Sequence, residues 1–256
     1  MSPNTWPAEA IWEQVYPLLP DFTVEVLPEI DSTNSELMRR ARAGQHEATL
    51  LVAERQTAGR GRMGRVWQSQ PGDSLTFSLS LPMAPKDWSG LSLAVGVSLA
   101  ESLHPQVGLK WPNDLWVQER KLGGILVEAA SMGGRSQVVI GVGLNIRPRP
   151  AEGMNTPPAA LTEWLPDISA PSALALVAAP LIQTVLAFEQ SGFAPLQARF
   201  EARDVLKGRR VHTSDGMHGT SLGVSASGAL RLQTDAGVVD IHSSEVSVRP
   251  FAEDKP

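Results

Sequence analysis

The sequence predicts an α+β fold in which helices cover a mixed β-sheet, followed by a small C-terminal β-barrel. β-type runs and helical patterns are mixed along residues 8–203 without the regular βαβ alternation of a doubly wound fold. From residue 206 onward, short β-type runs separated by glycines are typical of a compact barrel. We therefore expect two domains, residues 1–205 and residues 206–256.

The individual elements follow from hydrophobic period and from capping or turn residues. Helices are predicted for residues 8–19, 31–44 and 88–103 and for most of 159–203, with Thr33 as the N-cap of the second. Strands are predicted for 22–27, 48–56, 74–82, 109–117, 121–130 and 137–146. The strand 74–82 alternates with period two, so we expect it to bury one face. Pro148 to Pro158 is a surface connection.

Composition limits the classes of protein and of site. The 256 residues include 22 basic and 27 acidic side chains, so the net charge of −5 provides no global attraction to nucleic acid. The absence of cysteine excludes disulfides, thiolate nucleophiles and cysteine zinc sites. The N-terminus shows no secretory signal, and the apolar segment 173–188 falls short of a membrane span. We expect a cytoplasmic protein with no membrane partner.

The segment GRGRMGR, residues 59–65, is the first candidate site. Its glycine spacing matches a dinucleotide fingerprint, but the Pro-Gly-Asp turn at 71–73 is not a helix start, which argues against a Rossmann loop. A solvated loop and a nucleic-acid arm with Trp67 as its stacking residue remain open alternatives. Four arginines within residues 55–65 of an acidic chain favour a loop that holds several anionic oxygens.

Two further strings carry candidate residues. In KWPND, residues 110–114, polar side chains flank a proline, and the tight QER turn returns Lys121 toward them. Each residue alone is an ordinary surface or turn residue, whereas together they indicate a site. In VVIGVGLNI, residues 138–146, Gly141, Gly143 and Asn145 share one strand face, which leaves a slot for a ligand or, alternatively, marks a bulge or close helix packing.

These strings together resemble the biotin protein ligase family. The resemblance rests on DSTN (31–34), ERQTAGRGRMGRVWQS (54–69), KWPNDLWVQERKLGGILVE (110–128), VVIGVGLNI and the glycine-punctuated C-terminal segment. It implies a class II synthetase-like (SH2-like) catalytic core and an SH3-like barrel. Because only thirty residues precede Asp31, we expect the monofunctional class without an N-terminal DNA-binding domain.

The resemblance implies that ATP and biotin react to biotinoyl-5′-adenylate and pyrophosphate, and that the biotinoyl group then passes to a lysine of a biotin carboxyl carrier protein of acetyl-CoA carboxylase or a related enzyme. It assigns catalytic roles to Arg62, Lys121 and Asp114, the last alternatively as acceptor of the incoming lysine's proton. The implied biotin-binding residues are Ser32, Thr33, Asn34, Gln56, Gly59, Arg60, Arg62, Trp67, Lys121, Gly124, Gly141 and Gly143. The implied ATP-binding residues are Arg62, Arg65, Lys110, Asn113, Asp114, Lys121, Asn145 and Arg249.

Mg²⁺ is expected to be held mainly through phosphate oxygens and water, with no dedicated protein metal site. Residues 32–34 also have a pure helix-capping explanation, and Arg249 a second one as a solvated terminal residue. A lipoate ligase of similar fold is the rival enzyme, and a nucleic-acid-binding module the rival of another class. We expect no DNA partner and a monomer or homodimer.

Overall fold

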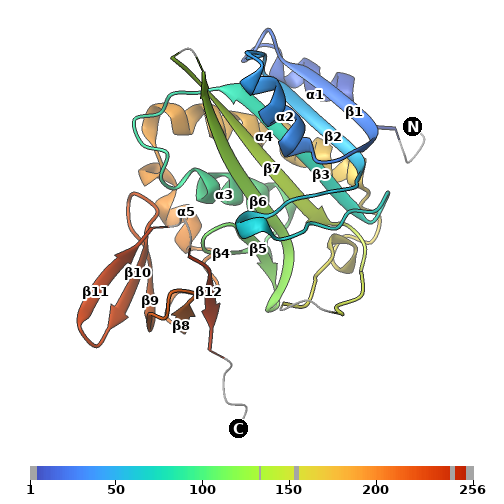
Figure 1. Cartoon of the computed structure of the whole chain (residues 1–256). Helices are drawn as coiled ribbons and strands as arrows, with labels where there is room; N and C mark the ends of the chain where they lie inside the picture. The colour runs from blue at the N-terminus through green and yellow to red at the C-terminus, as the bar shows by residue number, and fades with distance from the viewer. Residues whose placement is uncertain (1–4, 133, 153–155, 243–245, 252–256) are drawn as a thin grey trace.

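The computed structural model describes residues 5–132, 134–152, 156–242 and 246–251, and confirms the α+β class. Its main sheet has seven strands in the order β1-β2-β3-β7-β6-β5-β4 (Figure 1). β1 and β2 pair in parallel and the other neighbours are antiparallel. The strand bounds are β1 Thr23–Ile30, β2 Thr49–Gln56, β3 Ser74–Pro82, β4 Gly108–Lys110, β5 Asp114–Val117, β6 Arg120–Met132 and β7 Arg135–Asn145.

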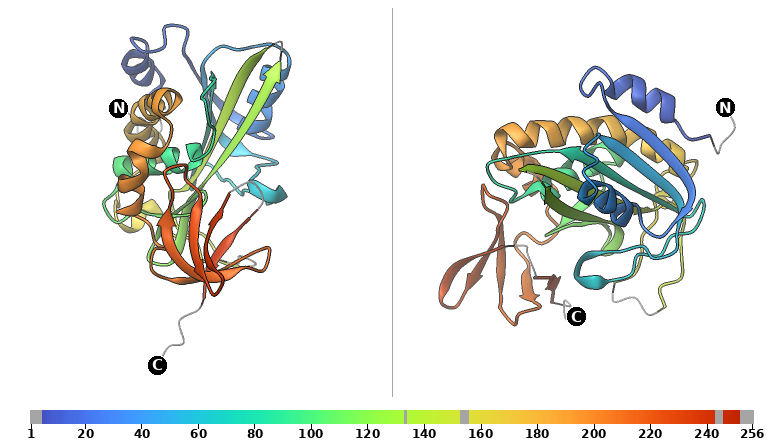
Figure 2. Two further views of the ribbon diagram at one scale, coloured as in Figure 1. Left: turned by 90° about the vertical axis from the view of Figure 1, so that its left-hand side faces the viewer. Right: turned by 45° about the horizontal axis from the view of Figure 1, so that its top comes forward.

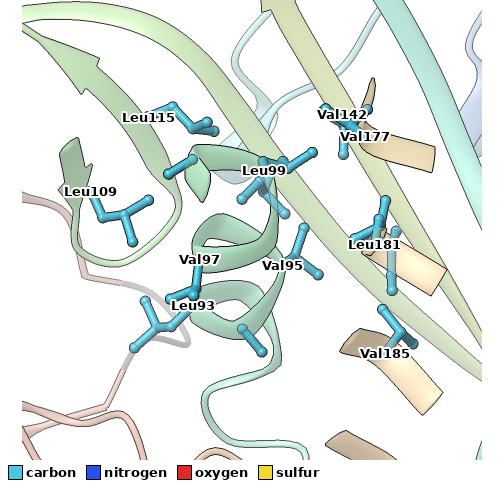
Figure 3. Close-up of a cluster of buried hydrophobic side chains, with 14 of the residues drawn as sticks. Leu93, Val95, Val97, Leu99, Leu109, Leu115, Val142, Val177, Leu181 and Val185 are labelled. Atoms are coloured by element: carbon cyan, nitrogen blue, oxygen red, sulfur yellow. The ribbon is translucent and has the colours of Figure 1, made fainter. Parts of the chain in front are cut away.

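Helices cover both faces of this sheet. α3 (Leu91–Leu103) and α4 (Ala170–Ser191) lie on one face, and α2 (Thr33–Arg42) lies on the other, as the edge-on view in Figure 2 shows. Side chains of α3 and α4 meet those of the sheet in the main apolar core (Figure 3). Because α2 covers only part of its face, the rest of that face is available for a site. The shorter helices are α1 Ala8–Val15, α5 Gln197–Glu201 and the 3₁₀ turns Arg62–Gly64, Leu161–Glu163 and Ala194–Leu196.

α4 is longer and more apolar than the sequence analysis predicted. It has 22 residues and a mean hydropathy of 1.8, which by length and composition suffice to cross a membrane. In the structure, 56% of its most apolar window is buried. Val177, Leu181 and Val185 point into the core beside α3 (Figure 3). The helix is therefore apolar because it packs inside the protein, as core helices do.

The C-terminal residues form a separate antiparallel sheet of five strands in the order β11-β10-β9-β8-β12. This C-terminal sheet contacts the main body through Trp111, whose indole Nε1 donates to the backbone oxygen of Gly228 at 3.1 Å. One apolar cluster continues from the main core into it, so the division at residue 206 stays a prediction. The strands are β8 Arg210–Thr213, β9 His218–Val224, β10 Leu230–Thr234, β11 Gly237–Ile241 and β12 Val248–Pro250.

Three local predictions were wrong. Ser32, not Thr33, is the N-cap of α2, and its hydroxyl accepts from the backbone N–H of Ser35. β3 is buried on both faces: its apolar side chains join the main core, and on its polar face Ser78 contacts Thr33 and Asn34 of α2. The predicted strand 109–117 is two strands, β4 and β5, which pair across the turn 111–113 so that Lys110 faces Asp114.

Candidate active site

A cavity of about 530 Å³ opens on the α2 face of the sheet. The N-terminus of α2, the end of β2, the loop 59–67, the strands β5 to β7 and the segment 247–250 of the C-terminal sheet contribute to its walls. This cavity collects every string that the sequence analysis singled out. Sixteen of the eighteen predicted site residues line it; Gly59 and Asn145 do not.

The floor of the cavity is a buried polar network. The Ser78 hydroxyl lies 2.7 Å from Thr33 Oγ1 and 2.6 Å from Asn34 Oδ1. Gln56 Oε1 accepts from both the backbone N–H and the hydroxyl of Thr33, at 2.8 and 3.1 Å. Each hydroxyl carries a single proton, so this network has more acceptor oxygens than protons to share among them. A ligand that brings N–H donors to this floor would complete it.

Asn34 links the floor to an ion pair at the cavity edge. Its Nδ2 donates to Glu128 Oε2 at 2.9 Å, and the same carboxylate oxygen lies 2.7 Å from Arg60 Nη2. The Arg60 guanidinium is thus held against β6. Its predicted contribution to ligand binding through the backbone stays a prediction.

The loop 59–67 is a closed backbone turn. The backbone N–H of Trp67 donates to Gly59 O at 2.9 Å, and that of Gly61 donates to Arg65 O at 2.7 Å. A Cβ on Gly59 would lie 2.4 Å from Trp67 O, so this glycine allows the two ends of the loop to meet. Met63, at the tip, adopts a left-handed φ of 56° and is exposed. Gly59 therefore shapes the loop without lining the cavity.

Arg62 extends from this loop across the cavity. Its Nη1 donates to Asn113 Oδ1 at 3.2 Å and its Nη2 to Val246 O at 3.4 Å. Burial lowers its pKa, and the nearby Asp114 carboxylate opposes that shift. Arginine stays charged in proteins, so the site holds a fixed cation there. Arg62 consequently joins the loop, the KWPND turn and the C-terminal sheet.

Lys121 and Asp114 form the central ion pair. Lys121 Nζ lies 2.6 Å from Asp114 Oδ1 across the β5–β6 pair, which confirms that the QER turn returns the lysine to this end. Gly124 provides the space, because a Cβ there would lie 3.3 Å from Lys121 Nζ. Asn145 Nδ2 donates to Lys121 O at 3.1 Å and to Ala159 O at 3.0 Å. Asn145 thus fixes the Lys121 backbone from beneath the cavity.

The two glycines of β7 accommodate side chains of the protein itself. A Cβ on Gly141 would lie 2.1 Å from Asn34 Oδ1, and one on Gly143 would lie 2.4 Å from the Trp67 ring. The glycines therefore allow α2 and the indole to approach the sheet closely. Of the two interpretations of VVIGVGLNI, close helix packing applies to Gly141, while both glycines still line the cavity.

Lys110 is buried, with 8% of its surface exposed, and its ammonium lies 5.1 Å from the centre of the Trp116 ring. Burial, opposed by the Asp114 carboxylate and assisted by the nearby positive charges of Lys121, Arg65 and Arg249, lowers its pKa to about 8. The lysine is therefore charged below about pH 8 and neutral above it.

This pKa predicts a pH dependence of nucleotide binding. As the pH rises through about 8, Lys110 loses its proton and kcat/KM for ATP is expected to fall, which initial rates from about pH 6.5 to about pH 9.5 would measure. In Lys110→Arg the guanidinium stays charged, so this decline should disappear. The same decline in both proteins would contradict the assignment.

Positive charge predominates around the cavity. Among the described residues, seven basic and two acidic side chains line it, although the whole chain is acidic. Lys and Arg groups that are held in place before a ligand arrives bring polyanions together at low reorganisation cost. No three His, Asp or Glu side chains within the described ranges group as metal ligands do. The side chains that line the cavity therefore favour an anionic ligand.

Sequence reasoning missed Ser78, Glu128 and Arg149. Ser78 sits in a run of alternating serines that looked like a solvated strand face. Glu128 lies within β6, the strand that carries Lys121 and Gly124, but was itself assigned no role. Arg149 lies in the Pro-rich connection, yet it lines the cavity with its guanidinium 5.2 Å from the centre of the Trp67 ring. Only the fold brings these residues to the site.

Comparison with known proteins is consistent with this geometry. Residues 26–145 match the model of the Biotin/lipoate A/B protein ligase family, and residues 208–249 match that of the Biotin protein ligase C terminal domain. The bifunctional ligase/repressor BirA of Escherichia coli is 36% identical over 249 residues, which cover 93% of this chain and 77% of that protein. The chain belongs to the biotin protein ligase family.

Other members of this family are similar over most of their length. The biotin–[acetyl-CoA-carboxylase] ligase of Paracoccus denitrificans is 30% identical, covering 86% of this chain and 98% of that protein. The structure of the Aquifex aeolicus biotin protein ligase in complex with biotin and ATP superimposes with a TM-score of 0.76 at 30% identity, covering 89% of this chain and 98% of that one. The biotin protein ligase fold therefore extends over nearly the whole chain.

Proposed function

We propose that this ligase activates biotin with ATP to biotinoyl-5′-adenylate and transfers the biotinoyl group to a lysine of a biotin carboxyl carrier domain. The observation that carries the proposal is the meeting, in one cavity, of an acceptor-rich floor and a set of fixed cations. The ring of biotin carries two N–H groups, and the oxygens of the floor would accept hydrogen bonds from them. Its carboxylate would then lie toward the cations.

In the first step the carboxylate of biotin attacks the α-phosphorus of ATP, and pyrophosphate leaves with the electrons of the broken P–O bond. The two reactants repel each other unless positive charge lies between them. Lys121 would neutralise the charge that develops at phosphorus; the contacts of its backbone with Asn145 and of its ammonium with Asp114, which hold it in the cavity, support this role. Arg62 supplies a second cation from the loop.

In the second step the amine of the carrier lysine attacks the acyl carbon, and AMP leaves. Arg62 would hold the reactive adenylate until the carrier arrives, because its guanidinium joins the loop to the opposite wall. Asp114 would orient Lys121 throughout. Its alternative role, as acceptor of the amine proton, is compatible with its place in the cavity.

Mg²⁺ would enter the reaction as part of the ATP substrate. The described residues offer no group of carboxylates or imidazoles as a ligand set, and Asp114 is already paired with Lys121. We therefore assign no protein ligand to the ion and derive no step through it. Phosphate oxygens and water would coordinate it, as is usual for this cation.

A lipoate ligase is the second candidate, since one family model covers both activities. The match of residues 208–249 to the C-terminal domain of biotin protein ligases favours biotin. The purified protein, incubated with ATP, Mg²⁺, a carrier domain and either biotin or lipoate, tests this directly by mass spectrometry of the carrier. We expect one biotinoyl group per carrier; modification with lipoate alone would overturn the proposal.

The carrier domain of a biotin-dependent carboxylase is the expected partner, as for the family. We propose further that the protein works in the cytoplasm, where ATP is available, as a monomer or homodimer without binding DNA. An excess of acidic over basic residues supports the last point.

A further inference from the structure

Two buried N–H donors at the cavity wall lack an acceptor. Trp67 Nε1 and Arg149 Nε are both buried and have no hydrogen-bond partner among the described residues. The Arg149 guanidinium stacks on the Trp67 ring, with its Cζ 5.2 Å from the ring centre, so the donors belong to one stacked pair. Buried donors are rarely left unpaired, since each costs free energy until an acceptor arrives.

Within the described part of the chain, Arg149 also has no carboxylate partner. Its Nη1 donates to the backbone oxygen of Gln68 at 3.2 Å, and no described acidic side chain lies within ion-pair distance of it. Burial alone lowers its pKa. A half-buried guanidinium that lines a cavity without a counter-charge favours a negatively charged ligand there.

The register of the sheet places this pair beside the central lysine. Gly143 and Gly124 are direct partners on β7 and β6, so the spaces above them are adjacent on one face. The Trp67 indole occupies the first space and the Lys121 ammonium the second. Cβ atoms of paired residues are about 5 Å apart, which puts the indole within roughly 10 Å of Lys121 Nζ.

We propose that Arg149 and the indole N–H of Trp67 together bind an anionic oxygen of the substrates, next to the group held by Lys121. This deepens the proposed function and rests on it. The oxygen belongs either to the biotin carboxylate or to a phosphate of the nucleotide, because both carry the same acceptor chemistry. Arg149 is then a binding residue, supplied by the connection after β7, that completes the set of cations.

Calorimetric titration and initial rates test the proposal and identify the source of the oxygen. The ligands are biotin, its alcohol analogue without the carboxylate, and ATP; the variants are Arg149→Gln and Arg149→Lys. Loss of a charged hydrogen bond is expected to weaken binding about tenfold in Arg149→Gln. If the affinity for biotin falls and the affinity for the alcohol does not, the bound oxygen belongs to the biotin carboxylate. If only the KM for ATP rises, it is a phosphate.

Arg149→Lys should recover part of the loss because it keeps the charge. Trp67→Phe removes the N–H while keeping an aromatic ring, and should weaken binding of the same ligand by a smaller factor. The two losses should not add in the double variant, since both donors serve one oxygen. Arg147→Gln is the matched control: this arginine is exposed, two residues earlier, and does not line the cavity.

Two results would overturn the proposal. One is that the active Arg149→Gln enzyme binds all three ligands with the same affinities as the active Arg147→Gln control. The other is equal weakening of biotin and its alcohol with a lowered melting temperature, which would make Arg149 a packing residue. In both cases an active wild-type enzyme leaves the proposed function standing, whereas an inactive wild type would refute that function instead.

Discussion

Lys121→Ala is expected to slow formation of the biotinoyl adenylate by about 10²–10³-fold, the usual loss when one preorganised group at a developing charge is removed. Biotin affinity should change by only a few fold, because the ammonium acts on charge that grows at phosphorus during the reaction rather than on bound biotin. Pyrophosphate release under single-turnover conditions measures the first quantity, and calorimetric titration with biotin the second.

The controls separate catalysis from folding. Lys121→Ala leaves the Asp114 carboxylate without its partner, so the double variant with Asp114→Asn shows what that unpaired charge costs in melting temperature. Lys207→Ala removes a lysine from an exposed ion pair with Glu201 and should leave adenylation unchanged. Equal losses of biotin binding and adenylation in Lys121→Ala would show that the lysine is structural.

Arg62→Ala is expected to release the adenylate early. The change removes the guanidinium that joins the loop to Asn113 and to the backbone of Val246, and the intermediate should dissociate roughly tenfold to a hundredfold faster. Escaped adenylate acylates free amines, so biotin should appear on bystander proteins. Dissociation of radiolabelled intermediate from the purified enzyme gives the rate directly.

Arg55→Ala is the matched control for this prediction. Arg55 precedes the loop and forms an exposed ion pair with Glu29, outside the cavity. It should retain the intermediate as the wild type does. Retention in Arg62→Ala that equals retention in Arg55→Ala would remove the role assigned to Arg62.

Local patterns predicted most of the fold. Glycine-rich turns and short β-type runs indicated the C-terminal sheet, and each helix and strand of the main body was found within a few residues, apart from the split of 109–117 into β4 and β5. The failures came from tertiary contacts. The strand 74–82 has a serine face that looks solvated until α2 lies on it, and Ser32 rather than Thr33 caps α2 while Thr33 bonds Gln56.

The candidate site was predicted where the resemblance supplied motifs. Lys121 and Asp114 meet as the turn between them required. Asn145 and Gly59 do not line the cavity: one fixes the backbone of Lys121 and the other allows the loop to close, so their assignment to ligands stays a prediction. Arg149 could not be found in the sequence, because its position over Trp67 depends on how two loops distant in sequence meet.

The contact between Trp111 and Gly228 limits how this enzyme can be recombined with its relatives. A Cβ on Gly228 would lie 2.7 Å from the Cα of Gly90, and Gly228 has a φ of +82°. A chimera that joins the C-terminal sheet of a relative to the main sheet of this protein must therefore keep glycine at position 228. It must also keep a backbone carbonyl there that accepts the hydrogen bond from the Trp111 indole. Donor sequences without those features would yield hybrids that assemble poorly, however well each half folds in its own parent.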